Sequence, residues 1–446
     1  MVEAKRKRGL WTLPWQQQYQ EKTISAAQAV SLVRDHDVIA LAGGSCIPEA
    51  FIEALTARGH EVHDVRLLLG FALKPYQFME PEYKEHFDLE TVFVGPMERH
   101  SIKQGITTYV PIHLQKLGQW LDVRRPNIVA NAVTPPDGEG YMNRSLFAGL
   151  CHRRAFEAAD TVIVEVNRNL PYLSGDDFKI HVSEVDYIIE NDFPLIEIQD
   201  IEIAENERTI AGHIAEMIPN GSTIQLGLGG LANAVGYFLR DKKDLGVHAE
   251  VVSNSIMDLV RLGVANGSQK NFWPGKVLGC YCVGNQELWD FVNGNKDFVF
   301  SEVEYVNHPD IIGRNDNLIS INNTLLVDLT GQAASESIGP MQYSGTGGQF
   351  NFVSGASLSR GGKSILALNS TFKDREGRLR SRIVPYLSPG TIVSTPRNDV
   401  DYVVTEYGAV NLRWQSVAER VRRLISVAHP DFRDILLYSA QCNHWI

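Results

Sequence analysis

Thr223-Ile224-Gln225-Leu226-Gly227-Leu228-Gly229-Gly230 is the stretch that decides the fold. Its first four residues predict a short buried strand, its glycines a tight turn, and the residues from Asn233 to Leu239 a helix. A strand that passes through a glycine turn into a helix is typical of parallel α/β sheets. Glu250, in Gly246-Val247-His248-Ala249-Glu250, lies 21 residues beyond Gly229 (250 − 229). At this distance the glycines and the acid can lie on adjacent strand ends, so we expect one site to contain both.

The same pattern occurs earlier in the chain. Val38-Ile39-Ala40-Leu41-Ala42-Gly43-Gly44 precedes a helix-like segment from Pro48 to Leu55, and Gly44 lies 185 positions before Gly229. His63 precedes His248 by the same 185 positions, and Asn167 precedes Asn369 by 202. Offsets that keep their order and grow slowly predict an internal duplication with later insertions.

Each half alternates short apolar runs with amphipathic segments. The runs at 127–132, 161–164, 391–393 and 402–404 predict strands that are buried on both faces, as in parallel sheets covered by helices. We therefore predict an α/β protein of two similar open domains, residues 1–205 and 206–446, with the active site in the cleft between them.

The two halves differ at the acid. At the offset of 185, Glu250 of the second half corresponds to Val65 of the first. Only one copy then has the carboxylate, so we expect the second half to supply the chemistry and the first to shape the substrate pocket.

Composition excludes several classes of function. The net charge of −11 argues against a nucleic-acid-binding surface and gives no sign of membrane-surface binding. No run approaches the 18 apolar residues of a spanning helix. The basic start, Lys5-Arg6-Lys7-Arg8, lacks the apolar core of a signal peptide and is interpreted as a solvated tail.

An odd number of cysteines, 5 in a chain of 446 residues, predicts reduced thiols and a cytoplasmic location. Cys280 and Cys282 lack a second ligand pair at metal-binding spacing, the histidines are scattered, and no nucleophile elbow occurs. We expect no metal site. The pair is interpreted as filling for a strand or the core.

Two glycine motifs suggest phosphate binding. Gly227 to Ala232 fits the loose dinucleotide pattern, with an acid about 20 residues on. Against a nicotinamide cofactor, Glu250 is predicted to precede the strand Val251-Val252 rather than to end one. Gly361-Gly362-Lys363-Ser364 resembles a phosphate loop but has Ser357 where the pattern needs glycine, and a strand follows it where the pattern needs a helix.

Ordered blocks along nearly the whole chain resemble the family I CoA-transferases. The branch is that of the acetyl-CoA hydrolases/transferases, typified by 4-hydroxybutyrate CoA-transferase and butyryl-CoA:acetate CoA-transferase. The blocks are Gln225 to Val235, Gly246 to Glu250, Val327 to Gln332, Gly347 to Ala356, Gly361 to Ser364, Ser370 to Asp374, Ser381 to Pro385 and Val404 to Gly408, with Pro135 to Tyr141 and His181 to Tyr187 in the first half.

The resemblance implies roles for named residues. It makes Glu250 the nucleophile and Gly348 a source of oxyanion and coenzyme contacts, and it assigns Asn322, or its neighbour Asn323, to the acyl oxyanion. The remaining residues implied to contact coenzyme A are Gln225, Gly227, Leu228, Gly229, Gly230 and Lys373.

The predicted reaction transfers CoA between a short-chain acyl-CoA and a carboxylic acid through a glutamyl-CoA thioester on Glu250. The alternatives are an acyl-CoA hydrolase that uses the same glutamate and, less favoured, a dinucleotide-dependent oxidoreductase. The expected partners are acyl-CoA, small acids such as acetate, butyrate and 4-hydroxybutyrate, and further copies of the chain in a homodimer or homotetramer.

Two departures from the family pattern bear on the acid. Trp414 stands where the family more often has glycine, and Arg144 lies in a block that is usually rich in small residues. If both line the acyl pocket, the site favours a short acid with a second polar or anionic group. Otherwise Trp414 packs in the core and Arg144 makes a weak surface ion pair.

Overall fold

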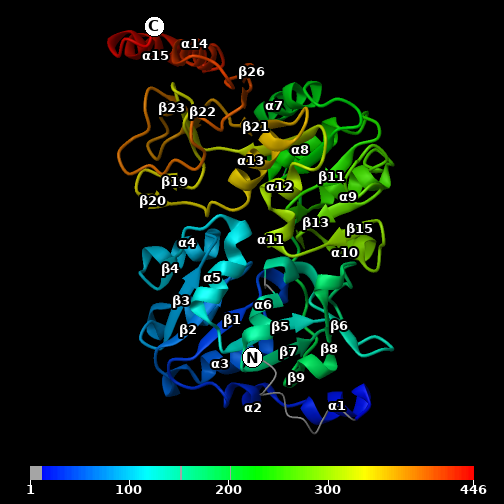
Figure 1. Ribbon diagram of the computed structural model, residues 1–446. Helices are drawn as coiled ribbons and strands as arrows, with labels where there is room; N and C mark the ends of the chain where they lie inside the picture. Colours follow the sequence, from blue (N-terminus) through cyan, green and yellow to red (C-terminus); the bar gives the residue numbers. More distant parts are fainter. Residues whose placement is uncertain (1–12, 151–152, 201) are drawn as a thin grey trace. The chain divides into compact units, whose positions relative to one another are not determined.

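The computed structural model describes residues 13–150, 153–200 and 202–446 (Figure 1). The chain forms two compact units, unit 1 with residues 1–198 and 279–305 and unit 2 with residues 199–278 and 306–446. The boundary predicted between 205 and 206 lies close to the first change of unit. No feature of the sequence indicates that the segment 279–305 returns to unit 1. The basic run Lys5 to Arg8 lies outside the described residues.

Unit 1 is built on a parallel sheet in the order β4-β3-β2-β1-β5-β7-β9. Its strands are β1 (Val38–Leu41), β2 (Val65–Leu69), β3 (Phe87–Thr91), β4 (Thr107–Tyr109), β5 (Ile128–Val133), β7 (Thr161–Val166) and β9 (Tyr187–Glu190). Its main helices are α1 (Trp15–Lys22), α2 (Ala26–Val30), α3 (Glu49–Ala57), α4 (Pro96–Lys103), α5 (Leu117–Arg124), α6 (Arg153–Ala158) and α10 (Gln286–Val292).

Both faces of this sheet are buried, as the apolar runs predict. Ile39 and Leu41 of β1 pack in a cluster with residues of α2 and α3, while Ala40, between them, is buried on the opposite face. β1 therefore has no polar face, which agrees with the parallel α/β interpretation.

Unit 2 repeats this topology. Its sheet contains, in order, β13 (Val277–Gly279), β11 (Gly246–His248), β10 (Thr223–Leu226), β16 (Leu318–Asn323), β21 (Lys363–Ala367), β25 (Tyr402–Thr405) and the antiparallel β26 (Gly408–Asn411). Its helices are α7 (Glu205–Glu216), α8 (Gly230–Phe238), α9 (Asn254–Arg261), α12 (Pro309–Ile312), α13 (Gln349–Leu358), α14 (Val417–Ser426) and α15 (Pro430–Cys442).

The common strand order supports the duplication. In each sheet the first strand of the repeat lies between the second strand and the third, since β1 pairs with β2 and β5 and β10 pairs with β11 and β16, all in parallel. The strand predicted at 391–393 does not form, and Ile392 is 47% exposed there. Lys363 begins β21, which confirms that the Gly361–Ser364 motif leads into a strand.

Strand register changes which residue of unit 1 is equivalent to Glu250. Val38 pairs with Arg66 in unit 1, and its counterpart Thr223 pairs with Gly246 in unit 2. Arg66 therefore corresponds to Gly246, and four residues farther on Glu250 corresponds to Gly70 rather than to Val65. The conclusion that only one copy has the acid is unchanged.

Candidate active site

Glu250 follows the carboxyl end of β11 by two residues. It belongs to no strand and directly precedes the short strand β12 (Val251–Val252), as the sequence predicts. β11 pairs in parallel with β10, and β10 runs into the turn from Gly227 to Gly230. The glycine turn and the acid thus occupy adjacent strand ends of one sheet, as the sequence predicts.

The glycine turn leaves open space. A Cβ atom built on Gly227 or on Gly229 meets no heavy atom within 4 Å, and Leu228 between them is 40% exposed. Gly229 has φ 104°, a left-handed conformation that favours glycine, and it caps α8 without a side-chain contact. At Gly230 a Cβ would lie 2.6 Å from the Glu207 carboxylate. The turn therefore offers an uncovered backbone surface beside the acid.

Two further residues of unit 2 meet the Glu250 carboxylate. The Asn307 side-chain amide Nδ2 donates to Glu250 Oε2 at 2.5 Å. Gly348 lies so close that a Cβ there would overlap the same oxygen and approach Asn307 Nδ2. Gly348 is also the N-cap of α13, where the helix dipole favours an anion. Only glycine can occupy position 348 without displacing the carboxylate.

Sequence reasoning found Gly348 but missed Asn307. Asn307 lies 57 residues from Glu250 and belongs to none of the quoted blocks. The only signal near it is the His308-Pro309 pair, which predicts a helix start and gives no indication of the acid that Asn307 contacts.

Asn322 and Gln225 form a separate, internal contact. Gln225 is 3% exposed, and its Oε1 accepts hydrogen bonds from Ser320 Oγ at 3.0 Å and Asn322 Nδ2 at 3.1 Å. Asn322 Nδ2 also donates to Ser320 Oγ at 2.9 Å, so both of its amide hydrogens are directed within the sheet. The structure therefore gives Asn307, rather than Asn322, the amide that faces the acid.

Lys373 ends β22 (Thr371–Lys373), which pairs with β23 (Leu379–Ser381), and its side chain is exposed. Its contact with the coenzyme stays a prediction.

His248 supports this cluster from inside the sheet. Its Nε2 lies 2.8 Å from the Val306 carbonyl and its Nδ1 lies 2.8 Å from Asn315 Nδ2. Burial and the nearby ammonium of Lys270 lower the pKa of His248 to about 3, so the ring is neutral at physiological pH. Burial also lowers the pKa of Lys270 to about 7, and its Nζ donates to the carbonyls of Val247 and Lys276.

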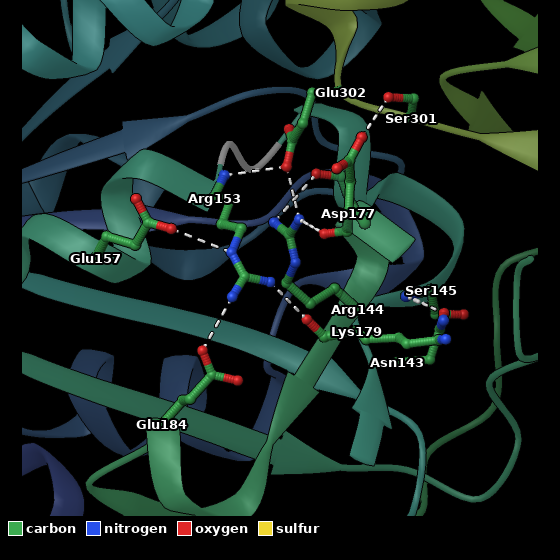
Figure 2. A network of polar contacts seen from close by, with 11 residues as sticks. Asn143, Arg144, Ser145, Arg153, Glu157, Asp177, Lys179, Glu184, Ser301 and Glu302 are labelled. Carbon is green, nitrogen blue, oxygen red and sulfur yellow. Dashed lines mark hydrogen bonds and ion pairs between the residues drawn. The ribbon is translucent and has the colours of Figure 1, made fainter. Parts of the chain in front are cut away.

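Arg144 neither lines an acyl pocket nor makes a surface ion pair, the two alternatives that its sequence left open. Its side chain is 1% exposed and pairs with Glu302 at 2.6 Å, while its Nη2 also donates to the Asp177 carbonyl (Figure 2). Phe156 and Phe178 lie against its guanidinium, at 5.0 and 5.9 Å. Arg144 is therefore a buried structural residue of unit 1, and both the surface ion pair and the carboxylate-reading role are corrected.

The same network attaches the segment 279–305 to the rest of unit 1. Glu302 Oε1 also accepts from the Arg153 backbone, and Ser301 donates to the Asp177 carboxylate (Figure 2). These contacts join parts of the chain up to 158 residues apart. They explain why the segment packs with unit 1.

The alternative that Trp414 packs in the core is also wrong. It lies between β26 and α14 with 87% of its surface exposed, so it does not pack in the core. Its φ of 61° is left-handed, a conformation that glycine adopts with less strain than tryptophan. The Arg413 guanidinium lies over its ring at 5.2 Å.

Across the described ranges, no three His, Cys, Asp or Glu side chains are grouped to hold a metal. Among the same residues, no helix has the length and apolar character needed to cross a bilayer. Cys280 and Cys282 are buried, which agrees with their interpretation as core filling.

Comparison with known proteins identifies the family. Residues 1–198 match the acetyl-CoA hydrolase/transferase N-terminal domain and residues 284–440 match the C-terminal domain. The chain is 38% identical to 4-hydroxybutyrate coenzyme A transferase of Clostridium kluyveri, over 95% of this chain and 98% of that protein. It is 39% identical to succinyl-CoA:cyclohexane-1-carboxylate CoA transferase of Geobacter metallireducens, over 96% and 97%.

A solved structure supports the same relationship. RipA from Yersinia pestis is 34% identical in sequence and superposes with a TM-score of 0.90, covering 97% of this chain and 100% of that one. Its architecture therefore matches the α/β fold described above.

Proposed function

We propose the following reaction for this chain, which belongs to the acetyl-CoA hydrolase/transferase family. It is a CoA-transferase that moves CoA between a short-chain acyl-CoA and a carboxylic acid. The observation that carries the proposal is the Glu250 carboxylate, with the Asn307 amide on one oxygen and a side-chain-free Gly348 beside it. The open turn from Gly227 to Gly230 supplies space for the thioester end of the coenzyme.

The first half-reaction transfers CoA to the enzyme. A carboxylate oxygen of Glu250 attacks the acyl-CoA carbonyl, the carbon–sulfur bond breaks, and a mixed anhydride and CoA thiolate result. The thiolate then attacks the glutamyl carbonyl and releases the first acid, which leaves a glutamyl-CoA thioester. In the second half-reaction an acceptor acid attacks this thioester, and the two steps run in reverse. Glu250 is restored as a carboxylate.

Asn307 has a defined task in these steps. Each attack on the glutamyl carbonyl converts its oxygen into an oxyanion, and Asn307 Nδ2 already lies 2.5 Å from Glu250 Oε2. A donor placed in advance stabilises such charge without reorganisation. We assign Gln225 to support of the neighbouring strand β16, because its buried amide contacts Ser320 and Asn322.

The dinucleotide interpretation is set aside. The family match and the closeness of Asn307 and Gly348 to the acid favour acyl transfer over ribose binding.

The test is to incubate the protein with acetyl-CoA or butyryl-CoA alone. Without an acceptor acid, the glutamyl-CoA thioester should accumulate, and mass analysis of the Glu250 peptide, or borohydride reduction to the alcohol, detects it. Glu250→Gln is the control that cannot form it. An unmodified peptide from protein that exchanges CoA between acids contradicts the mechanism.

The same incubation separates transfer from hydrolysis. A transferase releases about one equivalent of the free donor acid, keeps CoA as the thioester on Glu250 and then waits for an acceptor, whereas a hydrolase continues to release free acid and free CoA. A panel of acetate, butyrate, 4-hydroxybutyrate and succinate then identifies the acid, since Arg144 no longer supports a dicarboxylate preference.

A further inference from the structure

His248 lies close to the proposed nucleophile without facing the substrate. It is the last residue of β11, two positions before Glu250, and it is fully buried. Both of its ring nitrogens contact protein atoms of unit 2. It therefore has no proton to exchange with an acyl-CoA or an acid, and the reaction described above does not use it.

The contacts of the ring fix its tautomer. The Val306 carbonyl can only accept a hydrogen bond, so the nitrogen 2.8 Å from it, Nε2, has the hydrogen. The ring is neutral, so Nδ1 is bare and accepts from the Asn315 amide. Asn315 Nδ2 also donates to the Ile312 carbonyl at 3.2 Å, which holds the amide in this orientation.

These contacts lead to both groups that meet the Glu250 carboxylate. The carbonyl held by Nε2–H belongs to the peptide bond between Val306 and Asn307, and the Asn307 side chain donates to Glu250. The ring forms a T-shaped pair with Phe352 of α13, with 5.9 Å between ring centroids. Phe352 is one helical turn from Gly348 and its N–H donates to the Gly348 carbonyl.

We propose that His248 is a positioning residue, whose Nε2–H holds the Val306–Asn307 peptide so that the Asn307 amide stays on Glu250. The inference rests on the proposed function, because the amide matters only if Glu250 reacts. The imidazole joins the strand that ends before the nucleophile to the peptide that precedes its hydrogen-bond donor. A small displacement of such a donor reduces the rate strongly even when the substrate still binds.

Two substitutions separate the ring nitrogens. The amide of His248→Gln reaches the position of Nε2 and can donate to Val306, whereas the shorter His248→Asn reaches only the position of Nδ1. The readout is the rate of glutamyl-CoA formation from saturating acyl-CoA. We expect His248→Gln to remain within about tenfold of the wild type and His248→Asn to be slower by about 10²-fold. The half-saturating acyl-CoA concentration should change less than about threefold in both.

A double-mutant cycle tests whether the effect passes through Asn307. Asn307→Ala alone should slow the reaction by roughly 10²-fold, as for the loss of one oxyanion donor. Adding His248→Asn should slow it less than about threefold further, since the contact that His248 protects is already absent. Multiplicative losses, or a His248→Gln variant as slow as His248→Asn, would overturn the proposal.

A measurement on the wild type tests the proposal even if the His248 variants fail to fold. Nitrogen-15 NMR of labelled histidine should show one ring protonated at Nε2 that does not titrate between pH 5 and 8, and titration in that range overturns the proposal. A wild type that forms no thioester contradicts the proposed function, whereas a wild type that reacts but lacks the Gln–Asn difference contradicts only the role of His248.

Discussion

The turn after β1 in unit 1 and the turn after β10 in unit 2 hold the same place in sheets of the same strand order, but one is filled and the other is open. Gly43 and Gly44 are buried, and a Cβ on Gly44 would overlap the Phe147 ring. Gly227 and Gly229 have nothing within 4 Å of an added Cβ. The duplicated backbone provides a turn at the strand end, and side chains from elsewhere decide whether a ligand can reach it.

The next strand of each repeat, β2 in unit 1 and β11 in unit 2, also ends differently in the two units. β11 leads to Glu250, whereas the corresponding position after β2 is Gly70. One of the buried carboxylates of unit 1 is Glu98, in the first turn of α4, which accepts from the backbone N–H groups of Ala72 and Gly95. Unit 1 uses its acid to hold two loops, and unit 2 presents its acid to the Asn307 amide beside an open turn. The same fold thus gives one structural copy and one reactive copy.

The comparison predicts the largest loss of activity for a substitution of Glu250. Glu250→Gln keeps the size of the side chain but removes the nucleophilic anion, so kcat should fall on the order of 10⁴–10⁶-fold. CoA binding, measured by calorimetry, should change little because the glycine turn is untouched.

Glu98→Gln is the matched control in unit 1. It replaces one acceptor by a donor that faces a backbone N–H, so the free energy of unfolding should fall by about 1–3 kcal/mol, with kcat of the folded protein within tenfold. Equal losses of kcat in the two variants would remove the distinction between a structural and a reactive acid.

The two turns give the second prediction. Gly44→Ala should lower the free energy of unfolding by about 2–4 kcal/mol, because φ is 52° and the new methyl group would overlap Phe147. Gly227→Ala should change it by less than about 1 kcal/mol and raise the KM for acyl-CoA several-fold. Urea unfolding and steady-state kinetics measure the two effects. Equal destabilisation by both substitutions would show that the second turn is also filled.

How much of this could be predicted from sequence depends on the range of the interactions. The parallel α/β architecture and its duplication follow from the apolar runs and their repeat, because strands such as β5 and β10 are buried on both faces and their composition shows it. Glu250 could be found because its motif is contiguous in sequence. The run at 391–393 failed because an apolar triplet alone does not determine pairing, and no neighbouring strand pairs with it in the described structure.

Long-range polar contacts could not be predicted. Asn307 meets Glu250 across 57 residues, and the Arg144–Glu302 pair, which attaches segment 279–305 to unit 1, spans 158 residues. No periodicity in the sequence links an asparagine or an arginine to the distant glutamate that it contacts. The sequence around Arg144 therefore cannot distinguish a substrate contact from a charge that is satisfied inside unit 1.

The third prediction concerns the strand that leads to Glu250, because a buried lysine donates to the Val247 carbonyl of that strand. Burial lowers the pKa of Lys270 to about 7 from an ordinary value of 10.5. Between these values the unfolded chain holds a proton that the folded chain lacks, so the free energy of unfolding rises with pH. From pH 7 to 9 this contribution is roughly 2–3 kcal/mol.

Lys270→Met removes the titrating group. Its free energy of unfolding should therefore lack the rise between pH 7 and 9 that the wild type shows, as measured by urea unfolding at several pH values. Parallel pH profiles for the two proteins would show that Lys270 stays charged in the fold.

The smallest effect is expected at Trp414, the remaining bulky departure from the family pattern. The comparison assigns substrate access to the open turn, so an exposed indole between β26 and α14 should not select the acid. In Trp414→Gly, relief of the left-handed φ opposes the entropy cost of glycine and the loss of the contact with Arg413. The free energy of unfolding should change by less than about 1 kcal/mol, whereas Trp289→Gly, at a side chain that is 3% exposed, should cost at least about 3 kcal/mol. The ratio of kcat/KM for succinate and butyrate should stay within about threefold, or ~0.7 kcal/mol. A tenfold change in that ratio would extend the acid-binding site to the β26–α14 connection and contradict the placement of substrate access at the turn.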